Sequence, residues 1–215
     1  LNNIKVASIG TLGILSKKFK QNTKNTTIDP IKIHKVLKKL KDLKIDNVIL
    51  EASSHGLKQH RLNNINFNTA IFTNLSRDHL DYHKTFKDYL NSKLILFNKL
   101  LKNKGNIIYD KNIPQANKLN KISHKKKLKK FDFGTEKSFF NITNIQHTNS
   151  QKKIDFILNK KKFSFKTFLT GNIQIKNLMF AILAAHLSKI KINDILKSVK
   201  KIKPINGRLE KIGRI

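Results

Sequence analysis

Residues 47–57 read NVILEASSHGL, and this stretch decides how the surrounding chain folds. Its first half is a short apolar run, which is typical of a buried strand in a parallel sheet. Residues 70–73 (AIFT) and 105–109 (GNIIY) are two further runs of the same kind. Polar residues follow the first run directly, at the place where open parallel sheets bind their ligands.

Amphipathic helices are expected between these strands. Asp29 and Pro30 are an N-cap residue and a residue favoured at the first helical position, and apolar residues near helical spacing follow them to residue 43. A second helix is expected over residues 85–101. Helices that alternate with short apolar strands predict an α/β fold with a mostly parallel, P-loop-type sheet and flanking crossover helices.

The pattern changes after residue 111. The later segments are an exposed loop or helix at 118–130, short β-type runs at 140–147, 154–158 and 163–168, and helices at 173–187 and 192–202. Polar separators between the three β-type runs predict a hairpin or meander. We therefore expect one α/β domain that carries a small antiparallel β flap.

The composition excludes several classes of protein. Hydrophobic residues make up 39% of the 215 residues, which is enough for a core and argues against wholesale disorder. The sequence has no cysteine and no run of 18 apolar residues, which excludes a disulfide framework and a membrane-spanning helix. It shows no secretory signal pattern, so we expect a cytoplasmic protein.

The formal net charge is +32, from 45 Lys and Arg against 13 Asp and Glu. Such a charge suggests a polyanion-binding protein. However, only four of the basic residues are arginine, and the lysines are scattered over the whole chain. Nucleic-acid readers rely on arginine for bidentate contacts and often interleave aromatic residues. We therefore favour a drifted composition on a solvated surface and expect no specific nucleic-acid partner, and polyanion binding stays open as the alternative.

Charged and polar side chains gather in residues 51–83. This window contains four of the eight histidines and three of the 13 acidic residues. Glu51 and His79 follow two neighbouring strands, and a carboxylate with an imidazole can share a hard divalent cation. Each residue alone is more often structural, but together they favour a site.

Two segments within this window carry a specific resemblance. Residues 51–61 (EASSHGLKQHR) and 72–83 (FTNLSRDHLDYH) resemble the ATP-dependent Mur ligases, and above all the MurE type, which adds the third residue to the peptidoglycan stem peptide. Further matches follow in the family's order: residues 8–13 (SIGTLG), 25–27 (NTT), Lys93 and residues 206–210 (NGRLE). The resemblance implies the central ATP-binding domain of a three-domain enzyme at residues 1–205. Residues 206–215 would be a linker or the start of a C-terminal domain.

The resemblance also implies roles for individual residues. Glu51 and His79 match magnesium ligands, and Lys93 matches a lysine that is carbamylated and adds oxygen ligands for the metal. The positions that match contacts to the UDP-linked substrate are Asn25, Thr26, Thr27, Ser53, Gln59 and Arg61. Those that match nucleotide contacts are Gln174, Asn177 and Arg208. Residues 173 and 174 depart from the family, because they are Ile and Gln where Phe and Asn are common.

The implied activity is an ATP- and Mg²⁺-dependent ligase. It would join a diamino acid to UDP-N-acetylmuramoyl-L-alanyl-D-glutamate through an acyl phosphate, in peptidoglycan synthesis. Meso-diaminopimelate is favoured over lysine on its frequency in the family, and a monomer without a membrane partner is expected. The Gly-Lys-Thr phosphate loop of these enzymes has no counterpart among the eight glycines, so we expect it upstream of Leu1 and expect the 215 residues alone to be inactive. A ligase remnant that folds without catalysing stays open as a second alternative.

Overall fold

The computed structural model describes residues 4–76, 78–134, 136–148 and 151–202. The chain forms two compact units. Within the described ranges, the first unit comprises residues 4–70 and 75–105, and the second comprises residues 71–74 and 106–202. Each unit has its own hydrophobic core. No helix in the described ranges is long and apolar enough to cross a membrane.

The first unit contains a sheet of four strands. They are β1 (Val6–Gly10), β2 (Gly13–Ser16), β3 (Lys20–Gln21) and β4 (Asn47–Leu50), in the order β3-β2-β1-β4. β1 pairs with β4 in parallel, whereas the β1–β2 and β2–β3 pairs are antiparallel. Gly13 has a φ of +88°, which an L side chain rarely adopts, and this permits the tight turn between β1 and β2. The strand at residues 47–50 was predicted, but its parallel pairing with β1, the antiparallel pairs and the separate small sheet were not.

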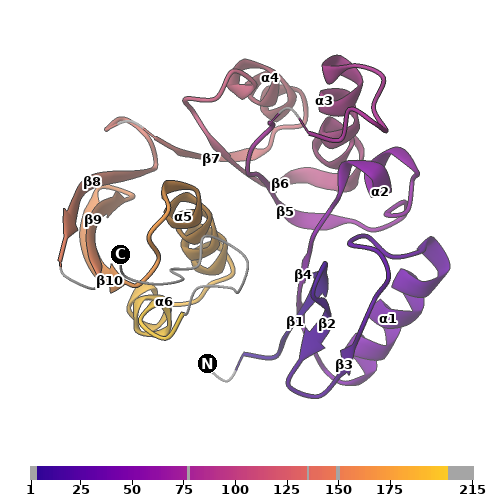
Figure 1. The fold of residues 1–215 in the computed structure, drawn as a ribbon, viewed down its shortest axis with the longest axis horizontal. Coiled ribbons are helices and arrows are strands. Elements are labelled where there is room, and N and C mark those ends of the chain that lie inside the picture. Colours follow the sequence, from indigo (N-terminus) through magenta and orange to yellow (C-terminus); the bar gives the residue numbers. More distant parts are fainter. Residues whose placement is uncertain (1–3, 77, 135, 149–150, 203–215) are drawn as a thin grey trace, which may run out of the picture. The chain divides into compact units, whose positions relative to one another are not determined.

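Helix α1 (Pro30–Asp42) lies along this small sheet (Figure 1). The Asp29 side chain caps it by accepting hydrogen bonds from the backbone N–H groups of Ile31 and Lys32, and Pro30 occupies the first turn. The predicted helix and its start are therefore confirmed. Its buried residues pack into one core with residues of β1 and β2: Ala7, Ile9, Ile14, Ile33, Val36 and Leu40.

Strand β4 differs from the prediction of a buried strand. It is the end strand of its sheet and pairs with β1. Val48 is 36% exposed and Ile49 is 66% exposed. An apolar run indicates a strand, but burial of both faces also requires neighbours on both sides and layers above and below. In the described residues β4 has those neighbours on one side only.

The polar segments after β4 and β5 (Phe67–Phe72) lead into two helices that contact each other, α2 (Ser54–Lys58) and α3 (Phe86–Ile95). A single π-helical turn, η1 (Leu96–Leu100), continues α3. Thr85 caps α3 by accepting a hydrogen bond from the Asp88 N–H. The helix predicted over residues 85–101 is confirmed, with a π turn at its end. The short α2 was not predicted.

The larger sheet has six strands in the order β10-β9-β8-β7-β6-β5. The further strands are β6 (Leu101–Asp110), β7 (Lys129–Phe133), β8 (Phe140–His147), β9 (Lys152–Leu158) and β10 (Lys161–Thr167). The division between the two units falls within β5 and β6. β7 pairs in parallel with β6 and β8, whereas β9 pairs antiparallel with β8 and β10. The α/β class and the antiparallel flap are therefore confirmed.

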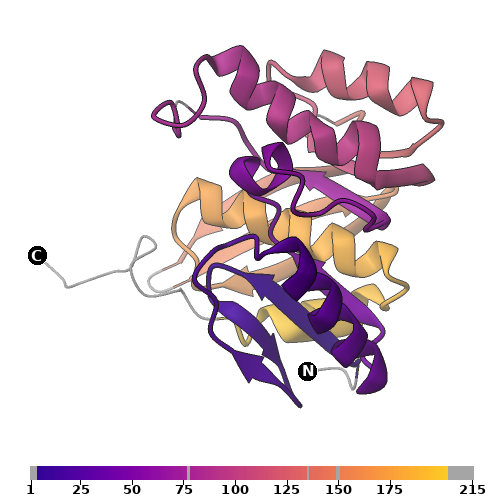
Figure 2. The same cartoon turned by 90° about the vertical axis from the view of Figure 1, so that its right-hand side faces the viewer.

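Three helices complete the second unit: α4 (Ala116–Lys125), α5 (Asn172–Leu187) and α6 (Ile192–Val199). Helix α5 lies within the curve of β8, β9 and β10, as Figures 1 and 2 show. Phe140 and Phe156 of the flap and Phe180 of α5 are almost fully buried in the same core. The segment predicted as a loop or exposed helix at 118–130 is helix α4 followed by the start of β7.

Candidate active site

The carboxylate of Glu51 is held at the end of β4 by the turn after β1. Thr11 donates two hydrogen bonds of 3.0 Å to Glu51 Oε2, one from its backbone N–H and one from its hydroxyl. A Cβ atom at Gly10 would lie 2.6 Å from the same oxygen, so this glycine gives the carboxylate its room. The Glu51 side chain is therefore oriented by its neighbours while the residue stays exposed.

A chain of hydrogen bonds joins this strand end to the start of α2. Gly56 N–H donates to Ser53 Oγ (3.1 Å), which donates to Thr27 Oγ1 (3.0 Å), which donates to the Glu51 carbonyl (2.9 Å). Ser53 N–H also donates to Thr27 Oγ1, at 2.9 Å. The hydroxyl of Thr27 thus has one donor bond and two acceptor bonds, which is its full capacity. This chain fixes the N-cap of α2 relative to the Glu51 backbone.

Close packing accompanies these hydrogen bonds. A Cβ atom at Gly56 would lie 2.5 Å from Thr27 Cβ, so only glycine lets α2 approach so closely. Arg61 Nη1 donates to the Thr27 carbonyl at 2.7 Å. The half-buried guanidinium is therefore oriented by the same loop that carries the hydroxyl network.

The remaining residues predicted to bind substrate surround this network. Thr26 Oγ1 lies 2.9 Å from Thr11 Oγ1, and Asn25 is exposed in the same loop. Gln59 ends α2, and its Nε2 donates to the Tyr82 hydroxyl at 3.0 Å. The structure thus joins four of the six predicted substrate-binding residues by hydrogen bonds near the start of α2: Thr26, Thr27, Ser53 and Arg61. Gln59 lies at the end of α2, and Asn25 is next to Thr26 in the chain.

His79 belongs to a second cluster, which is made of aromatic and imidazole rings. Its ring lies 5.1 Å from that of His55 and 5.9 Å from that of Tyr89, both edge to face. His79 has a φ of 57°, and its backbone N–H donates to Asp78 Oδ1 at 2.8 Å. Burial lowers the pKa of His55, and the neighbouring His79 and His83 lower it further, whereas Asp81 opposes the change.

Lys93 lies on α3 beside this cluster. Its Nζ is 5.2 Å from the centre of the Tyr89 ring, one helical turn earlier. Burial lowers the pKa of Lys93 because desolvation penalises the ammonium form, and the charge of Asp78 opposes the shift in part. A half-buried lysine in such surroundings has a larger fraction of the neutral amine, which is the form that reacts as a nucleophile.

Glu51 and His79 therefore fall in two clusters that meet at helix α2. Ser53, the N-cap of α2, belongs to the Glu51 cluster, and His55 belongs to the His79 cluster. The described ranges contain no ready group of three or more His, Cys, Asp and Glu side chains that could hold a metal. Oriented carboxylate oxygens and an imidazole nitrogen nevertheless fit Mg²⁺ in chemical type. A carbamate on Lys93 would add oxygen donors to this set.

Four neighbouring residues did not enter the predicted site. His83 is fully buried and contacts Ser54 of α2, and the carboxylate of Asp88 lies between His83 and Lys58. His83 ends the second segment that carried the family resemblance and is one of the four histidines in residues 51–83, and these were the only signals for it. Its contacts depend on α2 and α3 meeting, which no local pattern specifies.

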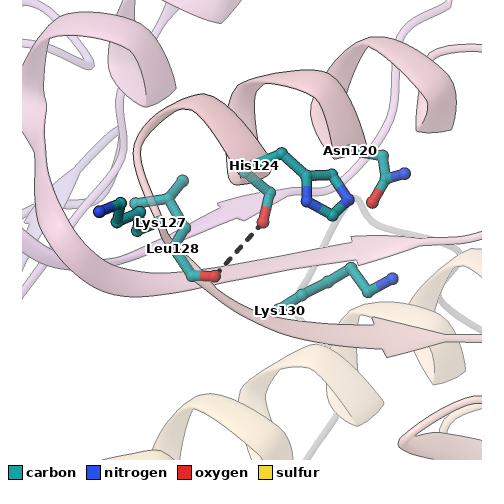
Figure 3. A pocket seen from close by; sticks show the side chains of 6 residues that line it. Asn120, His124, Lys127, Leu128 and Lys130 are labelled. Carbon is teal, nitrogen blue, oxygen red and sulfur yellow. Dashed lines mark hydrogen bonds between the residues drawn. The ribbon is translucent and has the colours of Figure 1, made fainter.

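Two of the three predicted nucleotide residues lie in the second unit. Gln174 and Asn177 are three residues apart on α5 and so share a face of that helix. Gln174 is half-buried and Asn177 is exposed. Arg208 lies outside the described residues. A hollow of about 310 Å³ in the same unit, beside α4, has none of the predicted residues in its lining, which includes Asn120, His124 and Lys130 (Figure 3).

Curated relatives with one shared name match nearly the whole chain. The "UDP-N-acetylmuramoyl-L-alanyl-D-glutamate–2,6-diaminopimelate ligase" of Rickettsia montanensis is 35% identical over 213 residues, which is 97% of this chain and 44% of that protein. The protein of the same name from Chelativorans sp. is 30% identical over 207 residues, covering 96% and 43%. The chain therefore spans less than half the length of these relatives.

Solved structures share the fold. One described under the same ligase name superposes with a TM-score of 0.86 at 25% identity, covering 99% of this chain and 43% of that one. A MurF ligase from Thermotoga maritima in complex with ADP gives 0.64 at 16% identity, covering 78% and 39%. An FPGS–AMPPCP complex gives 0.73 at 12% identity, covering 99% and 60%. The last two identities support the fold alone.

The family model for the Mur ligase middle domain matches residues 1–185. That range contains β1 to β10, α1 to α4 and most of α5, and with them the Glu51, His79 and Lys93 clusters. The family model and the relatives thus agree with the fold, and the chain belongs to the Mur ligase family.

Proposed function

We propose that these residues form the central, ATP-dependent part of a ligase that adds meso-diaminopimelate to UDP-N-acetylmuramoyl-L-alanyl-D-glutamate. The observation that carries the proposal is the Glu51–Thr27–Ser53 network beside His79 and Lys93, in a chain that is 35% identical to a ligase of that name. Residues 1–205 would be the central domain and residues 206–215 a linker. The protein would act in the cytoplasm as a monomer.

The site residues of the first unit would have two roles, substrate binding and metal binding. Asn25, Thr26, Thr27, Ser53, Gln59 and Arg61 would bind the UDP-linked substrate. Among these, the fork of Arg61 suits a carboxylate of the peptide. Glu51, His79 and a carbamylated Lys93 would hold Mg²⁺, which supplies charge neutralisation for the phosphates. The burial of Lys93 supports the carbamate, because only a neutral amine adds to CO₂.

The proposed reaction has two steps. A γ-carboxylate oxygen of the substrate's glutamate attacks the γ-phosphorus of ATP, and ADP leaves. The amine of the diamino acid then attacks the acyl carbon, the carbon–oxygen bond to phosphate breaks, and inorganic phosphate leaves with formation of the amide. Gln174, Asn177 and Arg208 would contact the nucleotide. The ordered loop around Thr27 would orient the γ-carboxylate of the substrate for attack on the γ-phosphorus of ATP.

A full-length enzyme that contains these 215 residues tests the proposal. It is incubated with Mg·ATP, the UDP-linked dipeptide and either meso-diaminopimelate or lysine, and the ligated product and ADP are measured. We expect product only when all three substrates are present, and more product with meso-diaminopimelate. ADP release without amide formation in either mixture would contradict the proposal. An inactive, folded enzyme would indicate a remnant that has lost catalysis.

Polyanion binding stays the second candidate, because the net charge is +32 and the lining of the hollow beside α4 includes Lys127 and Lys130. If the charge is only compositional drift, duplex DNA and RNA bind weakly, without sequence preference, and dissociate as salt rises, because binding then rests on counterion release. An electrophoretic shift assay with mixed competitor measures this. Sequence-selective binding that persists at physiological salt would establish the second candidate instead.

A further inference from the structure

His83 is a buried histidine to which none of the roles above is assigned. Its side chain is 0% exposed, and it lies in the first unit between α2 and α3. A buried imidazole costs free energy unless its nitrogen atoms find partners, so an apolar residue would fill this position at lower cost. Its partners therefore indicate what the histidine contributes.

Both nitrogen atoms of His83 face polar groups on different helices. Nε2 lies 3.0 Å from Ser54 Oγ at the start of α2. Nδ1 lies 3.4 Å from Asp88 Oδ2 in the first turn of α3, which is long for a hydrogen bond but close enough for electrostatic attraction. With a proton on Nδ1, Nε2 accepts from the Ser54 hydroxyl. Nδ1 itself has no hydrogen-bond partner among the described residues and faces the Asp88 carboxylate.

A lysine closes the connection between the two helices. Lys58 Nζ, in the last turn of α2, lies 2.5 Å from the same Asp88 oxygen. This contact keeps the pKa of Asp88 below its usual value, with a smaller contribution from His83. The first and last turns of α2 are thus both tied to Asp88, one through His83 and one directly.

The ring of His83 also supports the lysine side of the site. It stacks on the Tyr89 ring, with 4.9 Å between centroids and 23° between planes. Tyr89 in turn contacts the His79 ring edge to face and lies under Lys93 Nζ. A shift of His83 would therefore move the surface on which His79 and Lys93 rest.

We infer that His83 is a positioning residue that fixes the position of α2 relative to α3. Helix α2 begins at the Ser53 cap, and α3 carries Lys93. The inference rests on the proposed function, because it assigns these two helices to substrate and metal binding. Buried polar contacts of this kind specify one relative arrangement of two elements, whereas apolar packing tolerates several.

The order Ser54–His83–Asp88 is also that of a hydrolytic triad, but the surroundings exclude that role. Ser54 is 4% exposed and His83 is 0% exposed, so a substrate carbonyl cannot reach the hydroxyl. Asp88 is also paired with Lys58, which reduces the charge available to stabilise an imidazolium. The three side chains therefore act on position rather than on a reacting bond.

The test compares His83→Phe, His83→Gln and Ser54→Ala in the full-length enzyme. Phenylalanine keeps the ring and its stacking but loses both polar contacts, and glutamine keeps an acceptor for Ser54. We expect His83→Phe to lower kcat per folded molecule by more than about tenfold, or about 1.4 kcal/mol, and His83→Gln to recover part of it. Ser54→Ala added to His83→Phe should cause no further loss, since both remove the same contact.

His34→Phe is the matched control. His34 is exposed on α1 and lies within hydrogen-bond distance of Asn63 O, and neither residue takes part in the contacts of His83, so turnover should be unchanged. A folded His83→Phe enzyme with normal kcat and KM would overturn the inference. A loss of activity that is fully explained by a smaller fraction of folded protein would also overturn the inference. An inactive wild-type enzyme would instead contradict the proposed function. In that case the NMR spectra of the wild-type and His83→Phe 215-residue chains are compared. Amide shift changes that extend to residues 53–59 and 89–93 support the inference. Changes confined to residues 82–84 overturn it.

Discussion

The hydroxyl of Thr27 donates a 2.9 Å hydrogen bond to the carbonyl of Glu51, 24 residues later in the chain. Thr27 is 1% exposed, and the same oxygen accepts two hydrogen bonds from Ser53. One buried hydroxyl therefore joins the loop before α1, the end of β4 and the cap of α2. This contact makes Thr27 the structural centre of the region that is proposed to bind substrate.

Thr27→Val should destabilise the first unit by about 2 kcal/mol, because the Ser53 donors and the Glu51 carbonyl lose a buried partner. Valine has almost the same shape, so the loss reports the hydrogen bonds rather than the packing. Chemical denaturation followed by far-UV circular dichroism measures the change. Thr27→Ser keeps the hydroxyl and should restore most of it; equal stability of the valine variant and the wild type would show that this network contributes nothing.

Glu51→Gln and His79→Ala should each lower the turnover of the full-length enzyme by more than about tenfold, which corresponds to about 1.4 kcal/mol in the barrier. Binding of the UDP-linked substrate should change little, because these side chains are proposed to act on phosphoryl transfer. Steady-state kinetics and calorimetric titration separate the two effects. Glu136→Gln, at an exposed position in the second unit, is the control. Turnover within about threefold of normal, or about 0.7 kcal/mol, would refute the ligand assignment.

Lys93→Ala should abolish most of the activity, and a short carboxylate such as acetate should restore part of it. Lys93→Arg keeps the positive charge but forms no carbamate, so it should fail as badly as alanine. Intact-mass spectrometry under mild conditions and the bicarbonate dependence of turnover detect the modification. Lys99→Arg, on the exposed side of η1, should be unaffected. Near-normal turnover of Lys93→Arg would mean that the lysine acts through ordinary charge.

Tyr109 should be the last tyrosine to ionise. Burial, helped by the charge of Asp132, raises the pKa of Tyr109 to about 12. Since this folded-state pKa lies above the usual value near 10, the stability that the neutral phenol contributes is complete below about pH 10 and falls as the pH rises through about 12. Absorbance titration of the phenolate shows the step, and Tyr109→Phe should remove it. A complete tyrosine titration by about pH 10.5 in folded protein would contradict the assignment.

The sequence by itself determined the class of fold. The Asp29–Pro30 helix start, the apolar runs at 47–50 and 105–109, the flap strands and the helix over 173–187 all appear where local pattern and capping chemistry placed them. These elements are predictable because their signals are local: periodicity, caps and turn residues act within a few positions. The resemblance to the Mur ligases rested likewise on contiguous segments, and the family match confirms it.

Only the tertiary structure decided how these elements are combined. The antiparallel strands after Gly13, the exposure of Ile49 and the short helix α2 depend on which strands become neighbours, and that choice rests on contacts between distant segments. The same holds for the site. Thr27 meets Glu51 and Ser53, and His83 meets Ser54 and Asp88, through hydrogen bonds between residues that no local pattern brings together. A sequence pattern specifies which face a side chain takes, whereas burial and hydrogen-bond partners are set by the element packed against that face.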